Sequence, residues 1–211
     1  MINKKPSKLA AQFYDKIIKL HHKEFNYDRL DYKDQLDFLI TKINKGDIVL
    51  DLGCGNGRAI KYLIDNGLKG VGIDVSDKML NLAKKYVPEG NFYKQEFIKI
   101  KFKPNSFNAV ISFFALNHVS KSEFKEVIKI CRNILKKDGF LLLGMVKGEG
   151  EGFFEGFYNQ KMSLYGSGYT EEEIANILNL NKYKILKFEV RHFKGEHFEE
   201  DDIYLLAKVK K

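Results

Sequence analysis

The 211-residue sequence has few cysteines, few prolines and no long apolar run. Its two cysteines, Cys54 and Cys131, are too few for a disulfide scaffold or a four-cysteine zinc site. No apolar stretch approaches the roughly 18–20 residues that cross a bilayer, and residues 1–20 lack the apolar core of a signal peptide. The three prolines mark no linker. We therefore expect a cytoplasmic protein without a membrane partner.

Arginine is also scarce, although the chain is basic. Lysine and arginine total 36 against 28 acidic residues, which gives a formal net charge of +8. Only four of the 36 are arginine, whereas surfaces that read bases favour its forked side chain. The lysines are spread as on solvated helix faces, with one cluster between Lys4 and Lys23. This distribution disfavours a nucleic-acid-binding protein and leaves RNA open as an alternative partner.

The hydrophobic pattern predicts one α/β domain. Hydrophobic residues make up 44% of the chain, enough for a sizeable core. Helical stripes occupy 8–25 and 27–43. Short apolar segments at 47–52, 71–74, 91–96, 107–114 and 140–146 then alternate with amphipathic helices. This alternation predicts a parallel sheet, and the nearly unbroken apolarity of 107–114 predicts a strand buried on both faces.

The last third of the chain departs from this alternation. Residues 148–152 are glycine-rich and predict a flexible stretch. The aromatic segment that follows either walls an apolar substrate pocket or forms the core under a lid. Residues 184–193 and 202–210 alternate like strands with no helix between them, which predicts a hairpin. The aromatic residues are Phe153, Phe154, Phe157, Tyr158, Tyr165 and Tyr169.

A glycine-rich loop, Asp51-Leu52-Gly53-Cys54-Gly55-Asn56-Gly57-Arg58, follows the first strand and opens a helix. Its glycines allow a tight turn and close approach of a ligand, and the helix start offers unpaired N–H groups. Asp74, at the end of the second strand, lies 17 residues past Gly57. A carboxylate there accepts hydrogen bonds from both ribose hydroxyls. The sequence therefore predicts a nucleoside-binding site at the carboxyl edge of the sheet.

Details of this loop separate it from other nucleotide sites. The dinucleotide fingerprint needs a third glycine or an alanine where Arg58 stands. The P-loop pattern GxxxxGK[ST] is absent from the sequence. Asp51 directly precedes the loop, where a carboxylate suits a ligand with an ammonium and a sulfonium better than a pyrophosphate.

On these residues the chain resembles the class I S-adenosylmethionine-dependent methyltransferases. Their first motif is matched by Val49-Leu50-Asp51-Leu52-Gly53-Cys54-Gly55-Asn56-Gly57, and the resemblance covers about 47–146 and, more loosely, the terminal hairpin. It implies a Rossmann-like, mostly parallel seven-stranded sheet in the order 3-2-1-4-5-7-6, with strand 7 antiparallel and helices on its flanks. It also implies S-adenosyl-L-methionine as the methyl donor and S-adenosyl-L-homocysteine as the product.

The resemblance implies a single methyltransferase domain over 1–211. We expect an N-terminal helical cover at 1–45 and a cofactor-binding core at 46–147. Residues 148–211 are expected to hold a lid segment, a helix and the terminal hairpin.

Four cofactor-binding residues follow from the resemblance at the first two strands. Gly53 and Gly55 are expected to lie against the methionine moiety. Asp51 is expected to help hold that moiety through its amino group, and Asp74 to take the ribose hydroxyls.

Five more cofactor-binding residues follow from the later motifs. Val75 and Met79 are expected to border the adenine. Glu96, followed by Phe97, stands where the family often has an aspartate facing the adenine amino group. Phe113 belongs to the strand-end motif 112–118, which lines the transferring methyl group in the family.

His118 is the predicted catalytic residue. Methyl transfer from a sulfonium is mainly a matter of alignment, but an acidic nucleophile must also lose a proton. His118 follows the fourth strand at the open edge, and histidine titrates near neutrality. The alternatives are that it is a positioning group that only orients the acceptor, or that it only packs on the cofactor or bonds the backbone. Tyr14 is a candidate for closing over the cofactor, and His192 and His197 lack metal-ligand spacing, so no metal is expected.

A small-molecule acceptor is the favoured substrate. Family members that methylate amino groups of adenine or cytosine carry an Asn/Asp-Pro-Pro-Tyr/Phe motif, and the corresponding residues 115–118 contain no proline. Methylation of RNA or protein remains an alternative. A non-catalytic nucleoside-binding relative and a nicotinamide-dependent oxidoreductase are the alternatives of another class. The sequence leaves open whether the protein is a monomer or a homodimer.

Overall fold

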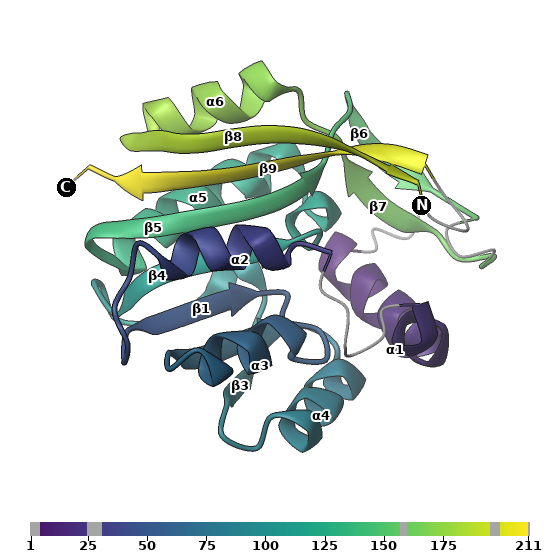
Figure 1. The fold of residues 1–211 in the computed structure, drawn as a ribbon. Helices are drawn as coiled ribbons and strands as arrows, with labels where there is room; N and C mark the ends of the chain where they lie inside the picture. The colour runs from purple at the N-terminus through teal and green to yellow at the C-terminus, as the bar shows by residue number, and fades with distance from the viewer. Residues whose placement is uncertain (1–4, 25–30, 157–159, 195–198, 211) are drawn as a thin grey trace.

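Seven strands form the central sheet, in the order β3-β2-β1-β4-β5-β9-β8 (Figure 1). Neighbours from β3 to β5 pair in parallel, and β9 is antiparallel to both β5 and β8. The predicted order is therefore confirmed, with β8 and β9 as its sixth and seventh strands. The strands are β1 Ile48–Leu52, β2 Lys69–Asp74, β3 Asn91–Lys94, β4 Phe107–Phe113, β5 Leu135–Val146, β8 Tyr183–Lys194 and β9 Glu199–Val209.

The computed structural model describes residues 5–24, 31–156, 160–194 and 199–210. Some predictions fall on residues outside these ranges. They concern the junction of the two N-terminal helices, the aromatic residues Phe157 and Tyr158, and the hairpin tip with His197. Lys4, at the start of the lysine cluster, and the side chain of Lys23, at its end, also lie outside the description.

Helices cover both faces of the sheet because successive side chains of a strand point to opposite sides. Val49 packs with α2 and α3 on one face, where α4 lies beside α3. Leu50, the next residue, packs with α5 and α6 on the other face. The helices are α2 Lys33–Ile40, α3 Arg58–Asp65, α4 Asp77–Tyr86, α5 Lys121–Ile134 and α6 Glu171–Leu180, with the short 3-10 helices η1 Phe97–Lys99 and η2 Leu116–His118.

The N-terminal helix α1, Pro6–Glu24, lies beyond the carboxyl ends of the parallel strands (Figure 1). Phe13 and Ile17 are fully buried there and form a small apolar cluster with Ala10 and Leu164. α2 has a different place, since Leu36 and Leu39 are fully buried on the sheet face. The N-terminal region therefore divides into a helix over the sheet edge and a helix in the face layer.

A second, two-stranded sheet occupies the segment predicted to be flexible. β6, Glu151–Phe154, pairs antiparallel with β7, Leu164–Ser167. The prediction of a flexible stretch at 148–152 is therefore wrong at its carboxyl end. The cause is tertiary: the Ser167 hydroxyl donates to the carbonyl oxygen of Val119 at 2.9 Å, which ties β7 to the turn after β4.

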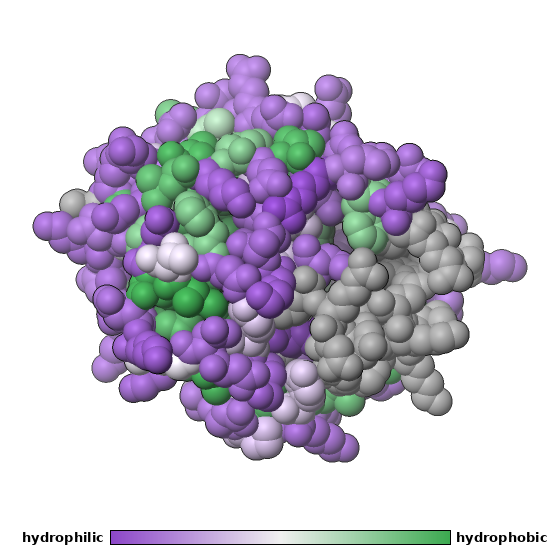
Figure 2. Space-filling model, in the orientation of Figure 1, coloured by the Kyte–Doolittle hydropathy of each residue, from purple (hydrophilic) through white to green (hydrophobic). Residues whose placement is uncertain are grey.

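Hydrophilic side chains cover most of the face shown in Figure 2, and smaller apolar patches lie between them. This distribution agrees with the spread of lysines along the sequence. Among the described residues, no helix combines the length and apolarity that a membrane crossing requires.

Removing the ring of Phe13 tests whether α1 is part of the folded core. Phe13→Ala should lower the free energy of unfolding by about 3–5 kcal/mol, because it leaves a cavity in a buried cluster. Denaturant unfolding measures the change, with Lys16→Ala on the exposed side of the same helix as the control. Unchanged unfolding of Phe13→Ala would show that α1 docks independently of the core.

Candidate active site

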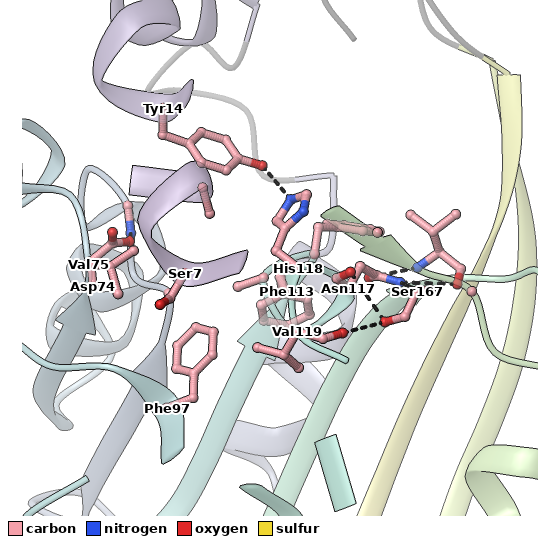
Figure 3. Close-up of a pocket in the computed structure, with 18 of the residues that line it drawn as sticks. Ser7, Tyr14, Asp74, Val75, Phe97, Phe113, Asn117, His118, Val119 and Ser167 are labelled. Atoms are coloured by element: carbon pink, nitrogen blue, oxygen red, sulfur yellow. Dashed lines mark hydrogen bonds between the residues drawn. The ribbon is translucent and has the colours of Figure 1, made fainter. Parts of the chain in front are cut away.

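One cavity of about 870 Å³ opens at the carboxyl edge of the sheet. Its wall combines the glycine loop after β1, the ends of β2 and β4, α1, the β6–β7 sheet and the start of β9. Ligand pockets ordinarily measure ~300–1,000 Å³, so this one has room for a nucleoside cofactor beside a small acceptor. Figure 3 shows Tyr14 reaching into it from α1, toward His118.

Asp74 fixes the shape of the glycine loop. One carboxyl oxygen accepts the Gly55 N–H at 2.9 Å and the other accepts the Ser76 N–H at 2.9 Å. Burial raises the pKa of Asp74, and the backbone N–H groups of Ser76, Gly55 and Val75 oppose that rise. The two carboxylate oxygens together can accept about four hydrogen bonds, so Asp74 keeps capacity for a ligand hydroxyl beside these three N–H groups.

Two of the three glycines of the loop are needed for different reasons. Gly53 has φ +76°, and a Cβ there would lie 2.2 Å from the Cβ of Ala115. Gly55 has φ +51°, and a Cβ there would meet no atom within 4 Å. Gly53 therefore allows the glycine loop to pack closely against the turn after β4 at Ala115. Gly55 has no side chain that would project into the cavity.

The predicted adenine side of the cavity is formed by α4 and η1. Met79 is buried at the start of α4, where its N–H donates to the capping Ser76 hydroxyl at 3.0 Å. The Glu96 carboxyl accepts from the Ser7 hydroxyl at 3.5 Å and pairs with Lys99 at 3.1 Å. Glu96 thus faces α1 as well as the cavity. Val75 and Phe97 line the same side.

The turn after β4 is held in a strained shape. Phe114 has φ +55°, a left-handed conformation that costs a bulky residue about 1–3 kcal/mol. Asn117 secures the turn: its amide oxygen accepts the Val146 N–H at 3.1 Å, and its nitrogen donates to the Ser167 carbonyl at 2.8 Å. Phe113, just before the turn, stacks on Tyr32 with 3.8 Å between ring centroids.

Both ring nitrogens of His118 are engaged. Nδ1 lies 2.9 Å from the carbonyl oxygen of Tyr165, which can only accept, so Nδ1 carries the proton. Nε2 then accepts the Tyr14 hydroxyl at 2.8 Å. Burial lowers the pKa of His118, which keeps the imidazole neutral at pH 7. Any action of His118 on a ligand therefore passes through Tyr14.

Nine of the ten predicted site residues line the cavity, and Asp51 does not. Asp51 is buried beside the loop, where burial and the charge of Asp74 raise its pKa to about 8. The nine are Gly53, Gly55, Asp74, Val75, Met79, Glu96, Phe97, Phe113 and His118.

Sequence reasoning missed Arg58 as a site residue. Its side chain lines the cavity with only 7% exposure, and Nε and Nη2 are buried with no hydrogen-bond partner among the described residues. A buried unpaired guanidinium is costly unless an anion completes it. The signal was present, because an arginine in the first turn of a buried helix directly follows the loop. It was interpreted only as a missing third glycine. Glu200 and Asp202, in the predicted terminal hairpin, were also missed.

Comparison with known proteins bears on this geometry. A family profile described as a methyltransferase domain matches residues 49–139. An uncharacterized methyltransferase of Oceanobacillus iheyensis is 25% identical over 195 residues, which cover 90% of this chain and 89% of that protein. An uncharacterized protein of Methanocaldococcus jannaschii is 35% identical over 142 residues, or 62% of this chain and 49% of that protein.

Solved structures share the fold. Magnesium protoporphyrin IX methyltransferase from Synechocystis PCC 6803, solved with bound S-adenosylmethionine, has a TM-score of 0.75, with 15% identity and 100% of both chains covered. The chain spans about half the length of two of the curated relatives that it matches. Motif, fold and relatives agree: residues 49–139 match a methyltransferase domain, and the chain has the fold of solved S-adenosylmethionine-dependent methyltransferases.

Buried carboxyl groups predict that stability falls as the pH rises. The folded-state pKa values of about 8 for Asp51 and about 7 for Asp202 lie above the ordinary 3.8. The folded chain therefore binds these protons more tightly than the unfolded chain, and this stabilisation is lost as the pH passes through the raised values. The lowered pKa of His118 makes stability rise with pH instead, but only below about pH 6.5, where the histidine of the unfolded chain is protonated.

We expect the melting temperature to fall between about pH 6.5 and 8.5. Asp51→Asn should flatten that dependence, and Asp65→Asn, at an exposed position, should not. Thermal unfolding over this range measures both variants. A melting temperature of the parent chain that rises with pH would contradict the assignment.

Proposed function

We propose that this chain transfers a methyl group from S-adenosylmethionine to a small-molecule acceptor. The observation that carries the proposal is the loop that Asp74 holds open beside an enclosed cavity large enough for two ligands. Support for a small acceptor comes from the charge of the wall. Among the described lining residues, Arg58 is the only cation, and a polyanion such as RNA is disfavoured by the eight carboxyl side chains Asp31, Asp74, Glu96, Glu123, Glu149, Glu151, Glu200 and Asp202.

The residues present fit the cofactor. Arg58 would pair with the methionine carboxylate, because its buried nitrogens lack a partner among the described residues. Asp74 would accept the ribose hydroxyls with its remaining lone pairs. Met79, Val75 and Phe97 would border the adenine. Asp51 would act on the amino group from beside the loop, through its field or an intervening water.

When bound, the cofactor supplies an electrophilic methyl group on a sulfonium. The chain contributes alignment, which can be worth roughly 7–11 kcal/mol. The β6–β7 sheet and α1 enclose the acceptor and exclude water. The Tyr14 hydroxyl donates a hydrogen bond to Nε2 of His118. Toward the methyl-accepting substrate, the Tyr14 oxygen can therefore only accept a hydrogen bond. His118 is thus a positioning residue for Tyr14, which differs from the direct general base that the sequence predicts.

Two measurements test the proposed function. Calorimetry with S-adenosylmethionine, S-adenosylhomocysteine and NAD should show binding of the first two only. Incubation with methyl-labelled cofactor and cell extract should place the label in the small-molecule fraction. Label in RNA or protein would contradict the acceptor class, and binding without any transfer would favour the non-catalytic alternative.

Replacing Arg58 tests the carboxylate assignment. Arg58→Leu should weaken binding of S-adenosylhomocysteine roughly 10- to 100-fold, because it removes a charge-assisted pair. Methylthioadenosine lacks the amino-acid part of the cofactor, so its affinity should stay unchanged. Calorimetry with both ligands separates the two effects. Equal losses for both would show that Arg58 acts by shaping the loop.

A double-variant cycle tests whether Tyr14 and His118 act as one unit. Tyr14→Phe and His118→Ala should each lower turnover by about 10- to 100-fold, and the double variant should lose no more than either single variant. The control is His192→Ala, because the side chain of His192 on β8 is exposed to solvent. Above about pH 6.5, the pH dependence of turnover should have the same shape in the parent chain and in His118→Ala, because burial lowers the pKa of His118. Additive losses would show independent roles.

A further inference from the structure

The start of β9 presents alternate acidic residues to opposite sides. Glu200 and Asp202 line the cavity. Glu199 and Asp201 are exposed instead, where both pair with His192 at 3.2 and 3.1 Å. This alternation is the period of a strand. Four successive acidic residues therefore divide into a pair inside the cavity and a pair outside it.

Asp202 is buried without a charge partner. Its side chain is 3% exposed, and Oδ1 has no hydrogen-bond partner among the described residues. Its other oxygen accepts only the Tyr204 hydroxyl, at 3.4 Å. A buried carboxylate is costly unless it is paired or hydrogen-bonded. Asp202 thus has an unfilled capacity for a cation or a hydrogen-bond donor.

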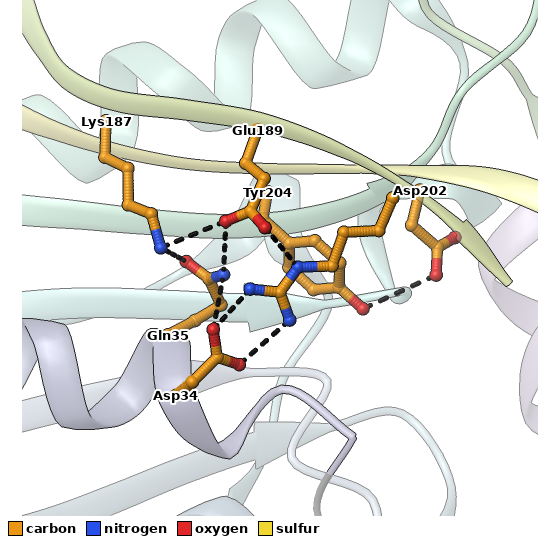
Figure 4. A network of polar contacts seen from close by, with 7 residues as sticks. Asp34, Gln35, Lys187, Glu189, Asp202 and Tyr204 are labelled. Carbon is orange, nitrogen blue, oxygen red and sulfur yellow. Dashed lines mark hydrogen bonds and ion pairs between the residues drawn. The ribbon is translucent and has the colours of Figure 1, made fainter.

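The nearby arginine does not fill that capacity. Arg191 is held by Asp34 and Glu189, and its guanidinium carbon lies 5.2 Å from the ring centroid of Tyr204. Figure 4 shows the Tyr204 hydroxyl pointing toward Asp202. In the part of the chain that the structure describes, neither Glu200 nor Asp202 forms an ion pair. No group of three or more potential ligands suited to a metal ion occurs there either. An organic cation is therefore the better complement.

The carboxyl pair lines the same cavity as Tyr14 and His118. The charges of Asp74 and Glu200 both add to the rise in the pKa of Tyr14 that burial causes. Burial and the charge of Asp202 also raise the pKa of Glu200 to about 7. A bound cation would relieve this repulsion. The pair thus shares the acceptor end of the cavity with the proposed positioning residues.

The apolar part of a ligand has its own surface at this end. Phe153 and Phe154 of β6 line the cavity and are 58% and 40% exposed. The edge of Phe153 packs on Tyr165 with 5.0 Å between centroids. Exposed aromatic rings and buried carboxyl groups that line one cavity favour a ligand that joins an apolar body to a cationic group.

We propose that Glu200 and Asp202 bind the ammonium group of a primary or secondary amine, which is the methyl acceptor. This inference rests on the proposed function and names its substrate class. Before transfer, the ammonium gives one proton to the Glu200 carboxylate, which passes it to water. The nitrogen lone pair then forms the bond to the methyl carbon. The carbon–sulfur bond breaks with its electrons remaining on sulfur, and the products are the methylated ammonium and S-adenosylhomocysteine.

Three probes of one size test the charge preference. Benzylamine, benzyl alcohol and benzoate share a ring and differ in charge, and each is titrated by calorimetry into the chain saturated with S-adenosylhomocysteine. Benzylamine should bind at least tenfold more tightly than benzyl alcohol, and benzoate should bind most weakly. An amine that binds no better than its alcohol overturns the inference.

Matched variants locate the preference. Asp202→Asn and Glu200→Gln should each weaken benzylamine binding roughly 10- to 100-fold and leave benzyl alcohol unaffected. Asp201→Asn and Glu199→Gln make the same changes on the outer side of the strand and should have no effect. Amine affinity that survives both inner variants also overturns the inference. Absence of S-adenosylhomocysteine binding to the parent chain would instead contradict the proposed function, so the two failures are distinguishable.

Discussion

The carboxyl group of Asp74 is the contact on which the site depends. It joins the glycine loop after β1 to the capped start of α4 through two backbone N–H groups. It adds a side-chain anchor to the backbone hydrogen bonds that the Gly53 and Cys54 N–H groups donate to the carbonyl oxygen of Ile73. The same carboxylate is the group proposed to hold the ribose. In that proposal, folding and cofactor recognition draw on one buried carboxyl group.

The fold was largely predictable because its signals are local. Apolar alternation marks the strands, and the glycine loop with Asp74 marks the cofactor side. What sequence reasoning missed is long-range. The β6–β7 sheet depends on Ser167 reaching the turn after β4, and the role of Arg58 shows only when burial leaves its guanidinium unpaired. The periodicity of apolar residues indicates neither a hydrogen bond between distant segments nor a buried side chain that lacks a partner. The sequence placed His118 at the edge where the cavity lies. It did not predict the hydrogen bond to Tyr14, because the two residues are 104 positions apart in the chain.

Under the proposed function, the cofactor and the acceptor occupy two parts of the cavity that offer different groups. The proposed cofactor half offers backbone N–H groups, one guanidinium and the anchoring carboxyl of Asp74. The acceptor half offers aromatic rings and the β9 carboxyl pair. A chain with net charge +8 thus encloses a strongly acidic interior. The lysines on the outer surface do not indicate the charge of the ligand, because most of the charged side chains that line the cavity are acidic.

The placement of α1 has a consequence for the timing of ligand exchange. Its described contact with β7 is a small cluster in which Phe13 and Ile17 meet Leu164. That cluster is far smaller than the two cores on the sheet faces, so opening α1 costs less than unfolding the sheet. A product leaving past α1 waits for that opening. Under the proposed function, the packing of a few apolar side chains, remote from the atoms that react, would then limit how fast such a product leaves.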